Sequence, residues 1–166
     1  KNATKAYGTD DPALEYEVDG LVEGDKLEGA LVRAEGVNVG TYDILQGTLK
    51  ASANYAVTFN KGTFTITAAE LTGITIDNVT AVYDGKAHSL DVPTNEGVTF
   101  KFGTTEGSYE ATTAPTLTDV GTLDIFYKAE KANFSPVTGK ATVTVTSKAV
   151  TVSGIEASIS TENGVS

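Results

Sequence analysis

The sequence predicts an all-β protein made of two small sandwich-like modules in tandem. Three observations support this fold class: short segments of alternating apolar and polar residues, glycines between these segments, and a set of motifs that occurs twice in the same order. Alternation with a period of two places the apolar side chains on one face of a strand. No segment has the spacing of a long helix, so we expect at most one short helical turn in each module.

The alternating segments predict strands in both halves of the chain. In the first half they are 14–18, 42–44, 57–59 and 63–67, with 60–62 as a hairpin loop between the last two. In the second half they are 74–76, 90–92, 98–102, 123–127 and 141–145. The nearest approach to a helical pattern, 22–27, is interrupted and flanked by glycines that limit it to about one turn.

An internal repeat relates the two halves. Three motifs of the first half, 7–8, 39–44 and 53–55, recur in order at 83–85, 120–125 and 132–134. The offset is nearly constant at about 80 residues, which predicts one small structural unit built twice.

The positions of the motifs and joins predict the domain boundaries. Each repeat closes on a strand in which threonine alternates, and a short join follows at 68–70 and at 147–149. Joins of about three residues span only about 10 Å and cannot let modules tumble freely. We therefore expect modules at 1–68 and 69–146, stiffly coupled, with 147–166 as the start of a further repeat or a C-terminal extension.

Two kinds of recurring residue have structural interpretations. Gly40 and Gly121 each precede a strand, where a positive φ or a close backbone approach would exclude a Cβ. Asn54 and Asn133 each precede an aromatic residue. We expect each amide to cap backbone groups at a bend while the aromatic ring anchors the bend in the core.

The first half resembles a known bacterial surface-protein module, the MBG module of the YGX type. The resemblance extends from Lys1 to about Thr67, and it is carried by the segments 7–8, 11–14, 20–25, 27–29, 39–42, 47–49 and 54–55. The second half is similar to a related YDG-type module at 82–85 and 133–134, but it lacks the Asp-Pro-Ala-Leu and Gly-Leu-Val-Glu-Gly-Asp stretches. The resemblance implies an immunoglobulin-like or related fold, strung in arrays on exported adhesins and cell-wall proteins, with no catalytic residues to carry over.

The same resemblance bears on the ends of the chain. In such arrays an opening strand often precedes the Tyr-Gly motif, as 71–76 precede Tyr83, whereas Lys1 to Ala6 precede Tyr7. We therefore expect the first module to lack an edge strand, and the chain to be a piece of a longer array.

Composition and charge exclude several functions. The net charge is −10, which repels phosphate backbones and anionic lipids, so neither nucleic acid nor direct membrane insertion is expected. The chain has no Cys, which removes disulfides, thiolate nucleophiles and cysteine zinc sites. No apolar run approaches the length of about 20 residues that spans a bilayer. We expect an extracellular protein at a bacterial surface or wall, monomeric, with neighbouring repeats as its partners.

No catalytic or cofactor-binding site is expected, and the chain is not predicted to be an enzyme. The single histidine, His88, stands beside Ser89, but neighbours on a strand point to opposite faces and do not form a triad. Zinc would need more His or Cys ligands. Structural calcium stays open, because scattered loop acids could hold it near the module join, around Glu70, Asp77 or Asp84.

Two further sites are weighed. A Lys-Asn isopeptide bond would staple a protein without disulfides, and the pairs that respect the repeat are Lys5 with Asn54 and Lys86 with Asn133. The second site is Tyr109, a loop tyrosine on which a sugar could stack. We expect a rigid stalk or spacer, and the alternative is an adhesin module that binds a carbohydrate or a host protein.

Overall fold

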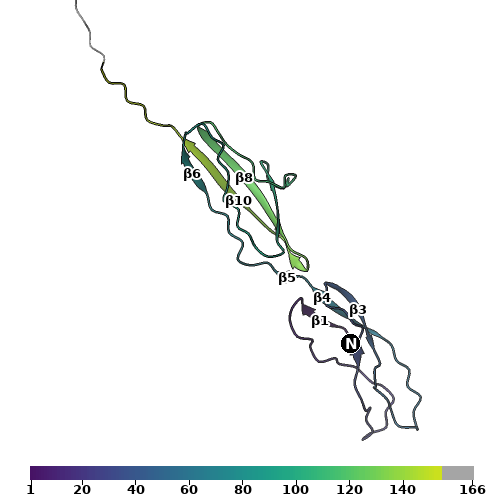
Figure 1. Cartoon of the computed structure of the whole chain (residues 1–166). Helices are drawn as coiled ribbons and strands as arrows, with labels where there is room; N and C mark the ends of the chain where they lie inside the picture. The colour runs from purple at the N-terminus through teal and green to yellow at the C-terminus, as the bar shows by residue number, and fades with distance from the viewer. Residues whose placement is uncertain (155–166) are drawn as a thin grey trace, which may run out of the picture.

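The computed structural model describes residues 1–154, which form two four-stranded sheets laid end to end and a two-stranded sheet between them (Figure 1). We name the part around the first sheet the first module (1–68) and the part around the second the second module (69–146). Strands and irregular segments account for the whole described part, which confirms the all-β fold class. Residues 1–154 thus contain no helix that could cross a membrane.

The first sheet has the order β1-β4-β3-β2. Its strands are β1 (Ala3–Ala6), β2 (Val32–Arg33), β3 (Gly40–Leu45) and β4 (Gly62–Thr67). β1 lies parallel to β4, whereas β3 is antiparallel to both β4 and β2. The first and last strands of the module are therefore neighbours that run in the same direction.

The second sheet repeats this arrangement in the order β6-β10-β8-β7. Its strands are β6 (Val79–Val82), β7 (Thr99–Gly103), β8 (Gly121–Glu130) and β10 (Val137–Thr146). Here β6 lies parallel to β10, and β8 pairs antiparallel with β10 and β7. The join between the modules is β5 (Ala69–Glu70), which pairs in parallel with β9 (Phe134–Ser135).

Equivalent residues hold the parallel pairs of both modules in register. The side chain of Asn2 accepts a hydrogen bond of 2.9 Å from the Thr63 amide, and Asn78 accepts one of 2.8 Å from Thr142. At the other end, the backbone amide of Tyr7 donates a hydrogen bond of 2.8 Å to the carbonyl of Thr67, the last residue of β4. The amide of Tyr83 donates one of 2.8 Å to Thr146, the last residue of β10. The repeat in the sequence therefore corresponds to a repeated structure.

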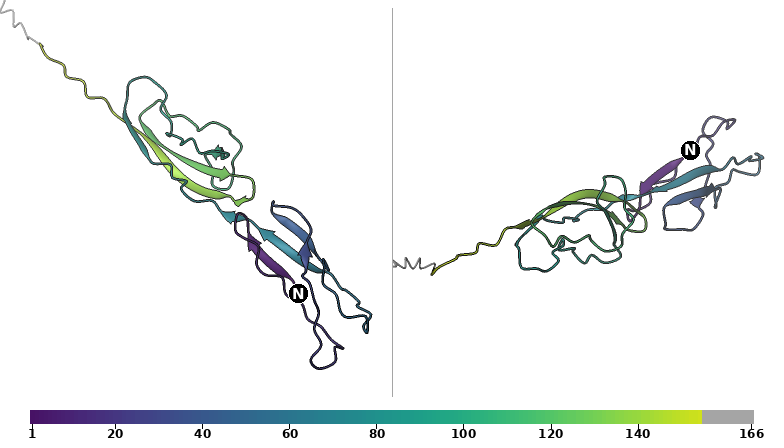
Figure 2. Two further views of the ribbon diagram at one scale, coloured as in Figure 1. Left: turned by 60° about the horizontal axis from the view of Figure 1, so that its bottom comes forward. Right: turned by 90° about the horizontal axis from the view of Figure 1, so that it is seen from above.

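The two modules differ in the size of their cores. Ile44, Phe64 and Ile66 form the buried cluster of the first module. The cluster of the second module is larger and consists of Ile76, Leu90, Phe102, Ile125, Tyr127, Ala141 and Val143. Irregular segments gather on one face of the second sheet and cover this core (Figure 2), with the isolated bridges His88–Leu117 and Phe102–Ala111 among them.

Several predicted strands are absent, although the fold class is right. Segments 14–18 and 57–59 form no strand, so the hairpin loop expected at 60–62 is wrong as well. Tyr16 and Val18 are 40% and 50% exposed rather than packed on a common face. The physical reason is that alternation marks a face that can be buried, whereas a strand also needs a neighbouring backbone to pair with.

A second group of predicted strands is irregular yet buried. Segments 74–76 and 90–92 make no ladder, but Ile76 and Leu90 are 6% and 7% exposed. Gly40 and Gly121 are the first residues of β3 and β8. Of the two alternatives predicted for them, the positive φ is found, at 159° in both, whereas the close approach is not, because a Cβ built at Gly40 would meet nothing nearer than 3.9 Å.

Separate cores predict separate unfolding. Changing Phe64 to Ala removes a fully buried ring and should destabilise the first module by about 3–5 kcal/mol. The unfolding midpoint of amide signals from the second module should hardly move in a denaturant titration followed by NMR. Val37→Ala, at a position 70% exposed, is the matched control and should shift neither module. Loss of both sets of signals at one lowered midpoint would contradict two independent cores.

Candidate functional site at the module junction

Asn133 is the central residue of the contact between the modules. Its side-chain oxygen accepts a hydrogen bond of 2.8 Å from the amide of Val39, and its amide nitrogen donates at 2.9 Å to the side chain of Asn38. Its own carbonyl accepts at 3.0 Å from the amide of Ala69 in the join. Asn133 is in the left-handed region with φ of 67°, a conformation that asparagine tolerates better than most residues. One residue thus binds the join and the first module.

Aromatic packing completes this junction. The rings of Tyr7 and Phe134 meet edge to face, with centroids 5.6 Å apart and an interplanar angle of 73°. The ammonium of Lys131 lies 5.2 Å from the centre of the Phe134 ring. Edge-to-face pairs contribute about 0.5–1.5 kcal/mol beyond the area they bury. The parallel pairing of β5 with β9 fixes the join itself, so the modules are coupled by backbone, amide and aromatic contacts together.

The structure revises the role expected for the Asn-aromatic pairs. The amide of Asn133 does bind backbone at a bend, but the backbone belongs to the other module, and Phe134 packs on Tyr7 rather than in a core. In the first module, the hydroxyl of Tyr55 donates to Asp25 at 2.5 Å and accepts from the amide of Val22. The bond to Asp25 raises the pKa of Tyr55. Tyr55 therefore anchors a loop.

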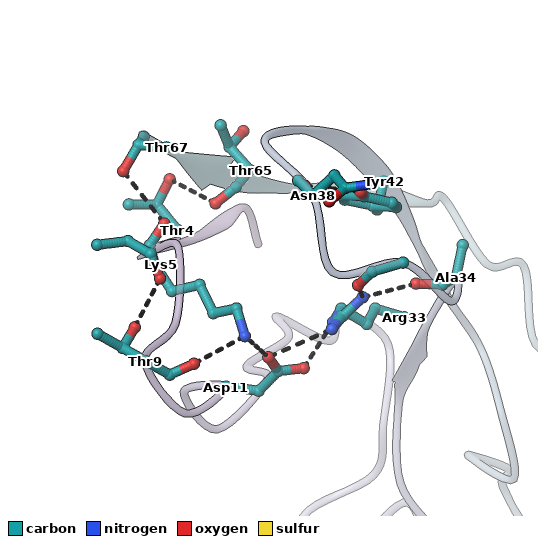
Figure 3. A network of polar contacts seen from close by, with 12 residues as sticks. Thr4, Lys5, Thr9, Asp11, Arg33, Ala34, Asn38, Tyr42, Thr65 and Thr67 are labelled. Atoms are coloured by element: carbon teal, nitrogen blue, oxygen red, sulfur yellow. Dashed lines mark hydrogen bonds and ion pairs between the residues drawn. The ribbon is translucent and has the colours of Figure 1, made fainter. Parts of the chain in front are cut away.

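A cluster of three charged residues, Lys5, Asp11 and Arg33, closes one side of the first module (Figure 3). The carboxylate of Asp11 lies 2.6 Å from the Lys5 ammonium and 2.5 Å from Nε of Arg33. The same guanidinium donates to the carbonyls of Ala34 and Gly36 at 2.9 and 2.8 Å. It also lies 4.8 Å from the centre of the buried Phe64 ring. The cluster thus connects β1 and β2 to the loop that carries Asp11.

The two cations hold the carboxylate of Asp11 in its charged form. The hydrogen bond from Arg33, followed by that from Lys5, lowers the pKa of Asp11 from 3.8 to about 2. The same pair raises the pKa of Arg33. Sequence reasoning missed this cluster, because Arg33 lies 22 residues from Asp11 and no short-range pattern connects them.

The residues that the sequence predicted could hold a ligand or a metal form no cluster comparable to that of Lys5, Asp11 and Arg33 in the part of the chain described. Tyr109 is half-buried and lines a shallow hollow of about 210 Å³ together with Glu106, Phe126 and Lys140. Within residues 1–154, no three His, Cys, Asp or Glu side chains come together in a way that could hold a metal ion. Glu70, Asp77 and Asp84, the acids near the join that were considered for calcium, are among these residues.

The histidine and the isopeptide pairs have other partners. His88 contacts Asp84 at 2.9 Å, while the hydroxyl of Ser89 donates to the carbonyl of Pro115 at 2.8 Å, so no triad forms. Lys5 is bound to Asp11, and the amide of Asn133 is bound to Asn38. The structure therefore brings neither predicted lysine-asparagine pair together.

A larger groove, of about 610 Å³, lies in the half of the first module that is remote from the junction. It runs between 16–21 and 55–62, and its apolar lining residues include Leu21, Leu27, Leu31, Leu49, Val57 and Phe59. Polar groups make up a similar share of the lining, with Lys1, Glu17 and Asp19 among them. Sequence reasoning did not predict this groove, which depends on where the pairing of β3 and β4 stops.

The structure is that of a tandem-repeat protein. Each small all-β module pairs its first and last strands in parallel, and a hydrogen-bonded junction joins the two modules. Residues 1–65 match the family model of the MBG domain (YGX type). This match confirms the resemblance of the first module to the MBG domain that the sequence predicted. The match indicates a repeat module of bacterial surface proteins, a family that is not typically catalytic. The YDG-type resemblance of the second module stays a prediction, and the chain has no match among curated proteins.

The charged cluster predicts a pH dependence of the first module. Because the pKa of Asp11 is lower in the folded than in the unfolded chain, its stabilising effect is complete above about pH 4 and is lost as the pH falls toward 2. The measurement is the thermal unfolding midpoint of the first module, followed by its amide signals between about pH 5 and 2. Asp11→Asn cannot be protonated in this range, so this midpoint should fall less steeply with pH than in the wild type. Asp10→Asn deletes the neighbouring charge and should leave the wild-type slope. Equal slopes in Asp11→Asn and wild type would contradict the assignment.

Proposed function

We propose that this chain is a load-bearing spacer of an exported bacterial surface protein. The observation that carries the proposal is the parallel pairing of β1 with β4 and of β6 with β10. When the first and last strands of a module run in the same direction, the chain enters at one end of the module and leaves at the other. Modules in series then extend along a line, which is the geometry that a stalk requires.

The same pairing suits a chain under tension. A force applied at the two termini pulls the first and last strands of a module past each other, along the strand direction. All hydrogen bonds between the paired strands then share the load, whereas an antiparallel terminal hairpin would open one bond at a time. The hydrogen bonds that the side chains of Asn2 and Asn78 accept lie at the start of the two ladders and add to this resistance.

The junction supports a stiff spacer rather than a chain of free beads. The contacts of Asn133 and the Tyr7–Phe134 pair leave no flexible linker between β4 and β5, which are separated by a single residue. For location, the family match supports a bacterial cell surface or wall, and the absence of Cys means that stiffness comes from strand pairing. We assign no catalytic residue. The partners proposed are neighbouring repeats.

A test of the spacer function is whether both modules orient as one body. Wild-type residual dipolar couplings should fit one alignment tensor for both modules. Asn133→Gly keeps the left-handed backbone accessible but removes both side-chain bonds, so each module should need its own tensor. Asn54→Gly makes the same substitution at the repeat-equivalent position of the first module, away from this junction, and should behave as wild type. Separate tensors in the wild-type protein would overturn the proposal of a stiff spacer.

The hollow beside Tyr109 supports one second candidate, an adhesin module that binds a carbohydrate. A half-buried ring flanked by Glu106 and Lys140 offers a stacking face and polar groups in one place. If this is the function, a glycan found on an array should bind about tenfold more weakly or worse after Tyr109→Ala. Tyr83→Ala, at another partly exposed tyrosine of the same module, is the control. Equal binding by wild type and Tyr109→Ala would exclude this site.

A further inference from the structure

The loop 34–39, which connects β2 to β3, carries the first module's half of the junction. The amide of Val39 donates to the side-chain oxygen of Asn133, and the side chain of Asn38 accepts from the nitrogen of that same side chain. No side chain of this loop is buried, and Val37 and Val39 are 70% and 43% exposed. Packing therefore does not fix the loop in place, so its position depends on polar contacts.

Arg33, the last residue of β2, holds the first half of this loop (Figure 3). Its Nη1 atom donates to the carbonyls of Ala34 and Gly36, while Nε and Nη2 donate to the carboxylate of Asp11. The planar guanidinium does both at once because its N–H donors point in fixed directions. Lys5 already places a positive charge beside Asp11, so charge alone does not require an arginine. The two loop carbonyls do, because the guanidinium spans positions that one ammonium group cannot occupy together.

Tyr42 of β3 holds the second half of the loop. Its hydroxyl donates to the carbonyl of Asn38 at 2.7 Å. A Cβ built at Gly36 would overlap the Tyr42 ring, so the backbone of the loop lies directly against this ring. The guanidinium of Arg33 lies 5.5 Å from the centre of the same ring. In the second module the residue equivalent to Tyr42 is Leu123, which has no hydroxyl to make this bond.

These contacts form one continuous path from the charged cluster to the junction. The path runs from Asp11 through Arg33 to the loop, which presents Asn38 and Val39 to the second module. Asn38 is the meeting point, because its carbonyl is bound within the first module while its side chain is bound by the second. The loop is thus an element with two states, held and released, which a coupling between distant contacts requires.

We propose that Arg33 and Tyr42 are positioning residues that set the stiffness of the junction by holding the loop 34–39 in the shape that Asn133 binds. Their side-chain hydrogen bonds in the described part of the chain all lie within the first module. The inference rests on the spacer function and deepens it, because it assigns control of the stiffness to residues away from the contact itself. Release of the loop turns a stiff joint into a flexible one while both modules stay folded.

Hydrogen exchange of the Val39 amide in the whole chain tests this inference, because this amide donates across the junction. Arg33→Lys keeps a positive charge near Asp11 but gives up the bonds to the loop carbonyls. Exchange at Val39 should then become about tenfold faster or more. Tyr42→Phe keeps the ring and removes only the bond to Asn38, so exchange should become about three- to tenfold faster.

Two references separate an effect on the loop from a general loss of stability. The Thr63 amide also donates to an asparagine side chain, that of Asn2, but within the first module, and its exchange should stay unchanged in both variants. The matched control variant is Lys5→Gln. It removes the other cation of the cluster, which binds Asp11 and Thr9 rather than the loop, and it should leave exchange at Val39 as in the wild type.

Residual dipolar couplings distinguish failure of this inference from failure of the spacer function. The wild type should fit one alignment tensor, and Arg33→Lys should need a separate tensor for each module. One tensor and unchanged exchange at Val39 in both variants would overturn the inference and leave the stiff spacer intact. Separate tensors in the wild type would overturn both. If Arg33→Lys speeds exchange at Val39 and Thr63 equally, Arg33 stabilises the whole module rather than the loop, and the inference fails.

Discussion

The parallel pairing of the first and last strands is the constraint on which the rest of this structure depends. It joins the two ends of each module's sequence in one ladder, so neither module can lose a terminal strand without opening its sheet. Because the two strands run in the same direction, the chain enters each module at one end and leaves it at the other. The end-to-end layout in Figure 1, the short join and the position of Asn133 against the first module all follow from this direction.

The two modules reach the same topology by different means. In the second module, long strands and a core of seven buried residues close the structure. The first module has a cluster of three buried residues, and Lys5, Asp11 and Arg33 connect its irregular segments to the sheet. The position of Arg33 over Phe64 joins this polar cluster to the core. Ion pairs at partly exposed sites contribute little individually, so the first module is expected to be the weaker of the two.

The sequence predicted the strands that have both a buried face and a backbone neighbour. The alternation at 63–67, 123–127 and 141–145 lies within β4, β8 and β10, which form the centres of the sheets. The same pattern failed at 14–18, because periodicity carries no information about a pairing partner. Short motifs identified Asn133 as a structural residue but not its partner Val39, which lies 94 residues away. The cluster around Asp11 was missed for the same reason, since long-range contacts leave no local signal.

Pulling a single molecule from its two termini measures the central claim directly, because the claim is that parallel terminal strands carry load in shear. Two unfolding events are predicted, each releasing the contour length of about 65 to 75 residues at about 3.5 Å per residue. Attachment points moved so that β10 is peeled from β6 should lower the unfolding force of the second module sharply. A chain that extends without discrete events, or that unfolds at the same force in both pulling directions, would contradict the account.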